Sequence, residues 1–172
     1  MGYEGELWFG NPSQKMNVLF DTGSACAWLY SEDCKSGSCP DKNQKYFQSK
    51  SQEFNETGHK TQNLAYGRGE IKGHPASDRT CFSSDEKHCV HNLNFLTVFH
   101  SEDLGMLKGS GLIGLSPNDH QADEIKMSNQ AGVKGFIAQL KENKDFTDKF
   151  EQIFSIYLSN DGESPGKITF GG

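Results

Sequence analysis

The sequence has no apolar run long enough to cross a bilayer and no cluster of basic residues. Its longest apolar stretches, such as residues 94–99, are far shorter than the roughly 20 residues that a spanning helix needs. The formal net charge is −6, which gives polyanions no attractive surface. We therefore expect no membrane span and no nucleic-acid partner.

A charged-then-apolar leader, an internal repeat and a low-complexity tract are also absent. The chain opens Met1-Gly2-Tyr3 and passes directly into a strand pattern, so we expect that a signal peptide and propeptide were either removed or lie outside the sequence. It stops at Gly172 right after another strand pattern, which is more typical of a cut than of a natural end. Its 172 residues, with 12 Phe and 23% charged residues, are enough for one folded domain.

Tight Cys-x2-Cys pairs are missing, although the sequence has five cysteines. Four of them form two close pairs, Cys34 with Cys39 and Cys81 with Cys89. We expect two disulfides that close small loops; a zinc site is the alternative, but these intervals lack the knuckle that structural zinc sites use. Disulfides indicate an oxidising secretory route.

Three other features of the sequence bear on its chemistry. Asn55 begins the one N-x-S/T sequon and is a candidate glycosylation site, although such triplets also occur by chance. Cys26 is expected to be a small buried residue rather than a nucleophile, because no base is placed beside it in the sequence. His88 and His91 flank Cys89, but their spacing is not a zinc pattern, so we expect surface histidines and no metal.

Short alternating or apolar segments bounded by turn residues predict a mostly β protein. The expected strands are residues 3–9, 16–20, 27–30, 93–99, 112–115, 154–158 and 167–170. A helix is expected where Val133, Phe136, Ile137 and Leu140 fall on one face. The interval up to Gln62 is expected to be loop that adds little to the core.

A tight hairpin is predicted over residues 64–71. Gly67 and Gly69 flank Arg68, and glycines tolerate the positive φ angles of a hairpin tip. We expect a projecting flap that carries Tyr66. The alternative is that Tyr66 is an ordinary strand aromatic.

The run Asp21-Thr22-Gly23-Ser24 follows three apolar residues. Its simplest interpretation is an Asx turn, in which the aspartate caps its own loop. The hydroxyls beside Asp21 can also hold the carboxylate by hydrogen bonds, which lowers its pKa. A second segment, Gly111-Leu-Ile-Gly-Leu115, has the form that lets another backbone pass very close, and we expect the two segments to form one site.

Four motifs therefore stand in order: Phe20-Asp-Thr-Gly-Ser, Tyr66-Gly-x-Gly, Gly111-Leu-Ile-Gly-Leu, and Phe154-Ser-Ile-Tyr-Leu-Ser with Ile168-Thr-Phe-Gly-Gly. In this order and spacing, the chain resembles the amino-terminal lobe of pepsin-like aspartic proteases of the pepsin and cathepsin D type. The resemblance implies an all-β fold in the main, with residues 1–172 forming one β-barrel lobe that has a flap hairpin and one or two short helices.

The resemblance also implies a role for each residue of the first motif. Asp21 would be one of two catalytic aspartates, supported by Thr22, Gly23 and Ser24, with Ser24 hydrogen-bonded to its outer oxygen and Thr22 gripping the opposite lobe. The two aspartates would share a proton and activate water for attack on a peptide bond in an acidic compartment. No cofactor is implied.

Substrate contacts are implied for the flap and the strands below it. Tyr66 would pair with Trp28, the backbone of residues 67–69 would bind an extended polypeptide, and Leu112 would line the pocket beside the scissile bond. Arg68 replaces a small hydroxyl residue that is often seen in the family, so we expect some preference for acidic or polar substrate residues. Cys26, Ala27 and Ser110 also depart from the family pattern, which puts local loop packing in doubt.

No second Asp-Thr-Gly or Asp-Ser-Gly occurs in the sequence. We therefore expect that a complementary carboxy-terminal lobe, or a second copy of the chain, must supply the other aspartate, and that the isolated lobe is inactive. The expected location is the secretory pathway, in a lysosome- or vacuole-like compartment or outside the cell. The alternative function is a non-catalytic binding or structural module derived from such a lobe.

Overall fold

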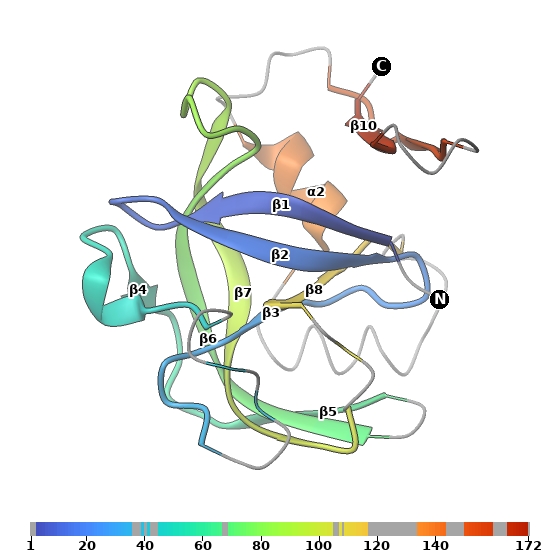
Figure 1. Ribbon diagram of the computed structural model, residues 1–172. Coiled ribbons are helices and arrows are strands. Elements are labelled where there is room, and N and C mark those ends of the chain that lie inside the picture. The colour runs from blue at the N-terminus through green and yellow to red at the C-terminus, as the bar shows by residue number, and fades with distance from the viewer. Residues whose placement is uncertain are drawn as a thin grey trace.

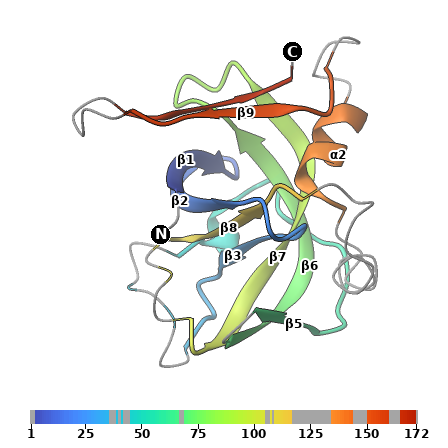
Figure 2. The same ribbon diagram turned by 90° about the vertical axis from the view of Figure 1, so that its right-hand side faces the viewer.

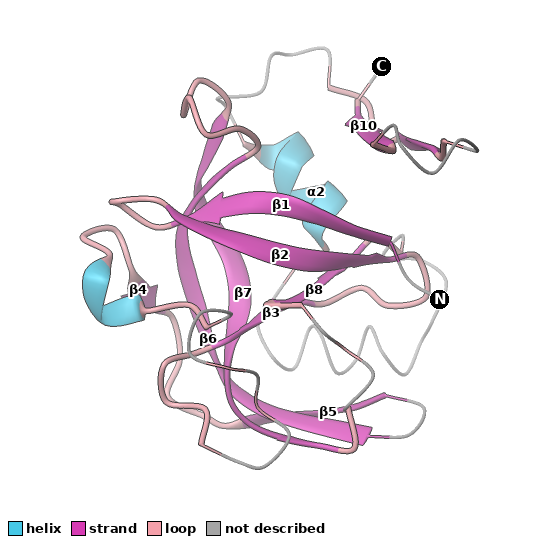
Figure 3. Cartoon of the chain, viewed as in Figure 1, coloured by secondary structure: helices cyan, strands magenta, loops and turns pink. Residues whose placement is uncertain are grey.

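Strands make up most of the structure, a computed structural model that describes residues 3–35, 39, 41, 45–66, 69–104, 107, 109–116, 134–143, 150–159 and 165–171. Figure 3 shows how few helical segments interrupt them. The strands are β1 (Tyr3–Phe9), β2 (Gln14–Asp21), β3 (Ala27–Tyr30), β4 (Asn55–Glu56), β5 (Gln62–Tyr66), β6 (Gly69–Cys81), β7 (Cys89–Glu102), β8 (Gly111–Gly114), β9 (Phe154–Tyr157) and β10 (Lys167–Phe170). The helices are the 3-10 turn η2 (Gln48–Lys50) and α2 (Phe136–Glu142). The mostly β prediction is confirmed.

Six strands close into a barrel (Figure 1). Their order is β1-β2-β8-β3-β7-β6, and β6 returns to β1 through the pairs Trp8↔Cys81 and Phe9↔Thr80. Most pairs are antiparallel, but β2 with β8 and β3 with β7 are parallel. Closing the sheet leaves the barrel strands with few open edges, because each one finds a partner on both sides.

Two predictions about this part of the chain were wrong. β6 continues to Cys81, well beyond the hairpin expected to end at residue 71, and β7 extends beyond both ends of the strand expected over residues 93–99. Gly73 and Pro75 lie inside β6 and are buried. The carbonyl of Pro75 accepts hydrogen bonds from the Thr57 and Gly58 amides, 2.9 and 3.3 Å away. The interval before Gln62 also contributes to the core, since Tyr46 is fully buried.

The buried side chains form two clusters. One fills the barrel between β1, β2, β7 and α2, and includes Phe9, Val18, Leu29, Phe95, Ile113, Phe136 and Leu140. The other lies under the β5–β6 hairpin and includes Cys26, Trp28, Tyr30, Leu64, Ile71, Leu96 and Leu112. The strand that ends in Asp21 is thus anchored from the barrel side, while the hairpin has its own apolar floor.

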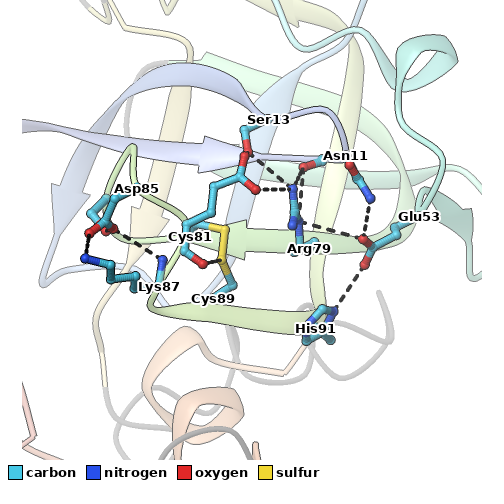
Figure 4. The surroundings of a disulfide bond; sticks show 12 residues. Asn11, Ser13, Glu53, Arg79, Cys81, Asp85, Lys87, Cys89 and His91 are labelled. Atoms are coloured by element: carbon cyan, nitrogen blue, oxygen red, sulfur yellow. Dashed lines mark hydrogen bonds and ion pairs between the residues drawn. A yellow bond between two sulfur atoms is a disulfide. The ribbon is translucent and has the colours of Figure 1, made fainter.

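The hairpin between β6 and β7 is closed by the Cys81–Cys89 disulfide, whose Cα atoms lie 3.9 Å apart. Figure 4 shows the neighbouring Arg79, whose guanidinium group lies between two carboxylates. Its Nη2 is 3.1 Å from Glu86 and its Nε is 3.7 Å from Glu53. The Gly10 carbonyl also accepts from Arg79, at 3.3–3.4 Å. Arg79 therefore joins the β1–β2 turn to two distant loops.

The last two strands form a separate two-stranded sheet. Figure 2 shows this β9–β10 hairpin above β1 and beside α2. It rests on the lobe through Phe170, whose ring packs against Phe136 and Phe20 at centroid distances of 5.5 and 6.1 Å. In the described part of the chain, no helix has the length and apolar character needed to cross a membrane.

Candidate active site

Asp21 is the last residue of β2 and is half-buried. Its Oδ1 accepts a hydrogen bond from the Gly23 amide at 3.0 Å, so the Asx turn considered above is present. The Asp21 carbonyl accepts from the Leu115 amide at 2.7 Å, and the Ser24 carbonyl accepts from the Ser116 amide at 2.9 Å. The loop after Asp21 is thereby tied to the segment after β8, as the sequence predicted.

The two glycines of β8 allow this close crossing. β8 lies between β2 and β3, pairing in parallel with the first and antiparallel with the second. A Cβ atom on Gly111 would lie 2.1 Å from the Trp28 carbonyl oxygen, and one on Gly114 would lie 2.6 Å from that of Ser24. Because no side chain fits at either position, the expected close backbone approach is confirmed.

The residues after Asp21 differ in exposure. Thr22 and Gly23 are exposed, while Ser24 is buried. The predicted hydrogen bond from Ser24 to Asp21 is absent, because the Ser24 Oγ has no partner among the described residues. No acidic side chain in the same part of the chain contacts the Asp21 carboxylate by a hydrogen bond. Asp21 is therefore a half-buried residue whose carboxylate has one backbone donor and which is followed by two exposed residues.

The predicted flap is an antiparallel hairpin of β5 and β6, which pairs Tyr66 with Gly69. Tyr66 accepts a hydrogen bond on its hydroxyl from the Trp28 Nε1 at 2.9 Å, so the predicted pairing of these residues is confirmed. Gly67 and Arg68, at the predicted tip, lie outside the described residues. A Cβ on Gly69 would lie 2.3 Å from the Glu102 carbonyl oxygen, which explains a glycine at this position.

The substrate residues predicted below the flap are largely internal in this chain. Leu112 is 2% exposed and Trp28 is fully buried. Both belong to the apolar cluster that supports Tyr66. Their direct contact with a substrate stays a prediction.

Two of the residues that depart from the family pattern, Ser110 and Cys26, have a clear structural role. Ser110 accepts a hydrogen bond on Oγ from the Asn17 amide at 3.2 Å, which ties the start of β8 to β2. Cys26 is buried, lies outside both disulfides and has its Sγ 3.5 Å from the Ala27 carbonyl oxygen. It is therefore a packing residue, as the sequence suggested.

The remaining predicted sites lie away from Asp21 in the sequence. Both disulfides are formed, Cys34–Cys39 with Cα atoms 5.9 Å apart and Cys81–Cys89 as described above, and they favour an oxidising secretory route. Asn55 is exposed in β4, and its modification stays a prediction.

Comparison with known proteins agrees with this geometry. The family model "Eukaryotic aspartyl protease" matches residues 2–172. The chain is 33% identical to plasmepsin VII of Plasmodium falciparum, 30% to human gastricsin and 28% to pepsin A of Gallus gallus, in each case over 99% of its length. It covers 37%, 40% and 42% of those proteins, so the chain spans about two fifths of the length of the curated relatives it matches. The chain, with Asp21 at the crossing of β2, β3 and β8, belongs to the eukaryotic aspartyl protease family.

Proposed function

We propose that the protein containing this chain is an aspartic endopeptidase, in which Asp21 and a second aspartate outside the chain activate water to hydrolyse peptide bonds. The placement of Asp21 carries the proposal. Its strand is held by β8, its loop is held by three backbone hydrogen bonds, and the residue is only half-buried. Family membership supplies the reaction class.

One carboxylate alone cannot complete this reaction. The water must lose a proton to a base while the carbonyl oxygen gains one from an acid, and two closely spaced carboxyl groups divide these tasks because they cannot both ionise easily. Asp21 alone would serve only one task at a given pH. We therefore infer that the isolated chain is inactive.

A surface next to Asp21 supports the proposal that another lobe packs against this one. Phe20, which precedes Asp21, lines a groove of about 680 Å³ between β1 and the β9–β10 hairpin. Four exposed apolar side chains line the same groove, namely Tyr157 (64% exposed), Tyr3 (49%), Leu158 (43%) and Ile156 (39%). Contiguous exposed apolar surface marks an interface, and the rest of the protein is the proposed occupant.

The proposed substrate is an extended polypeptide bound between this lobe and its partner, under the flap. The hydrogen bond from Trp28 to Tyr66 supports this, because it fixes one aromatic side chain of the flap over the apolar floor. The proposed location is a secretory, lysosome-like or extracellular compartment, which the two disulfides support.

The test is cleavage of unstructured peptides by the purified full-length protein at about pH 4, near the ordinary pKa of an aspartate. Asp21→Asn is expected to lower the rate by at least about 100-fold, because it removes a general acid or base. Asp41→Asn is a matched control, since it makes the same change at an exposed position.

Full activity of Asp21→Asn would overturn the proposal. A full-length protein that lacks a second Asp-Thr-Gly or Asp-Ser-Gly and cleaves no peptide would instead favour the non-catalytic module. Activity of the isolated chain, linked to dimer formation, would show that a second copy supplies the other aspartate.

A further inference from the structure

Three side chains with metal-binding atoms meet on β6 and β7, outside the site described above. They are Glu70, His100 and Glu102, and one ligand atom from each lies within 4.8 Å of the others. Glu70 is the residue after Gly69 in β6 and pairs with Ala65 of β5, so the group lies near the tip of the flap hairpin. These residues are far apart in the sequence, and no motif predicted their meeting.

The strand register explains why they share a face. Glu70 is directly opposite Glu102 in the antiparallel pair, and residues in that position point to the same side of a sheet. His100 is two residues before Glu102 in the same strand, and alternate residues also share a face. The three side chains are 40%, 60% and 30% exposed for Glu70, Glu102 and His100, so an ion from solvent can reach them.

The charges of this group favour a cation. Like charges placed directly opposite each other destabilise a strand pair, and Glu70 faces Glu102. Lys72 offsets part of this repulsion, with its Nζ 2.9 Å from the Oε1 of Glu70. A carboxylate has about four acceptor positions on its two oxygens, so the contact with Lys72 leaves Glu70 able to bind a second cation. Lys72 would then be the outer partner that orients the Glu70 carboxylate.

The distances suit a small transition-metal ion. Zinc binds imidazole nitrogen and carboxylate oxygen at about 2.0–2.2 Å, which puts neighbouring ligand atoms of a tetrahedral site about 3.3 Å apart. The His100 Nε2 lies 3.0 Å from the Glu102 Oε1, close to that separation. The third ligand atom, a carboxylate oxygen of Glu70, must move by only about 1.5 Å to reach that separation. The Glu70 side chain can do so because it is long and partly exposed.

We propose that Glu70, His100 and Glu102 form a binding site for Zn²⁺ or a similar divalent transition-metal ion, with water as the fourth ligand. The imidazole selects against Mg²⁺ and Ca²⁺, which prefer oxygen ligands alone. The bound ion would join the flap strand β6 to β7, near the tip of the flap hairpin. The site does not depend on the proposed peptidase activity.

The experiment is calorimetric titration of the full-length protein with Zn²⁺ in the presence of excess Mg²⁺. Loss of an outer-shell partner alone costs about 10–100-fold in metal affinity, so His100→Gln and Glu102→Gln are each expected to weaken one Zn²⁺ site by about 100-fold or more. Both side chains are partly exposed, and equal melting temperatures without metal will show that the variants are folded.

His91→Gln is the matched control, because the His91 Nδ1 contacts a single carboxylate, that of Glu53, at 3.1 Å (Figure 4). This variant is expected to bind Zn²⁺ as the wild type does. With Cu²⁺ as a probe, electron paramagnetic resonance is expected to lose the signature of one coordinated imidazole in His100→Gln alone. Wild-type protein that binds no Zn²⁺, or equal Zn²⁺ binding by wild type and His100→Gln, would overturn the proposal.

Discussion

At the scale of single residues, Asp78 and Asp21 differ in burial and in hydrogen bonding, and this difference indicates which one stabilises the fold and which one is free to react. Asp78 is fully buried, and its two oxygens accept hydrogen bonds from the Tyr46 hydroxyl and, at 2.7 Å, from the Arg79 amide. Asp21 is half-buried, has one backbone donor and is followed by the exposed Thr22 and Gly23. Asp78 is thus committed to the fold, whereas Asp21 remains available to a substrate or a second carboxyl group.

Replacing Tyr46 with Phe is expected to destabilise the protein. The variant leaves a buried carboxylate without one donor, which costs about 1–3 kcal/mol of unfolding free energy. Burial raises the pKa of Tyr46 far above its ordinary value, and the hydrogen bond and charge of Asp78 raise this pKa further. The folded state therefore keeps this phenol neutral at a pH where the unfolded chain ionises it.

The pH dependence follows from that difference. Below about pH 10 the Tyr46 hydroxyl makes its full contribution to the unfolding free energy. Above about pH 10 the unfolded chain is stabilised by ionisation of this phenol, so the difference in unfolding free energy between wild type and Tyr46→Phe shrinks as pH rises. Denaturant unfolding of wild type and Tyr46→Phe, at neutral pH and above about pH 10, measures this difference in unfolding free energy. Tyr3→Phe, at an exposed position, is the control. A wild-type advantage that stays constant with pH would contradict the expectation.

At the scale of elements, the crossing of β2, β3 and β8 determines where Asp21 lies. β8 touches β3 so closely that a Cβ on Gly111 would meet the Trp28 carbonyl at 2.1 Å and the Leu29 Cα at 2.9 Å. Neither contact is with a flexible side chain, so the two strands would have to separate. The hydrogen bonds that hold the loop after Asp21 extend from this crossing.

Gly111→Ala is therefore expected to lower the unfolding free energy by at least about 1–3 kcal/mol, the range for an overpacked core. Gly58→Ala makes the same chemical change where the new Cβ would meet the Pro75 side chain at an ordinary 3.5 Å, and its effect is expected to stay within about 0.5 kcal/mol. Thermal and denaturant unfolding of both variants give the comparison. Equal stability of the two would show that β8 can shift without cost.

At the scale of the whole molecule, the described residues leave an apolar surface open beside the β9–β10 hairpin. Ile156, Tyr157 and Leu158 are 39%, 64% and 43% exposed. We expect the isolated chain to self-associate as its concentration rises, because such a patch is an interaction or aggregation site. Sedimentation velocity measures this, and replacing Tyr157 and Leu158 with Ser is expected to reduce it.

The full-length protein serves as the comparison, since its additional chain is proposed to cover the same patch. It is expected to remain monomeric at concentrations where the isolated chain associates. An isolated chain that stays monomeric throughout would contradict the assignment of this surface as an interface.

Local sequence patterns predicted most of the strands, and the family resemblance indicated Asp21 as the candidate catalytic residue. Short alternating runs such as residues 3–9 and 27–30 became β1 and β3, because alternation of apolar side chains depends only on near neighbours. The pairing of Tyr66 with Trp28 was predicted from the family resemblance, and the structure has it. Local patterns did not show how far β6 extends, because its length depends on tertiary pairing. β6 continues through Pro75, which lacks an amide donor, and is paired with β4 and β7.

The sequence by itself determined which residues are candidates for the chemistry, where most of the strands lie, and that the chain has a single Asp-Thr-Gly motif. The tertiary structure decided which residues come into contact. It buries Tyr46 against Asp78, leaves the Ser24 hydroxyl without a hydrogen-bond partner among the described residues, and brings Glu70 close to His100 and Glu102. The physical reason is the separation along the chain of the residues on which each property depends. Side-chain alternation is a local property, whereas strand register and barrel closure depend on the summed packing of segments far apart in the chain.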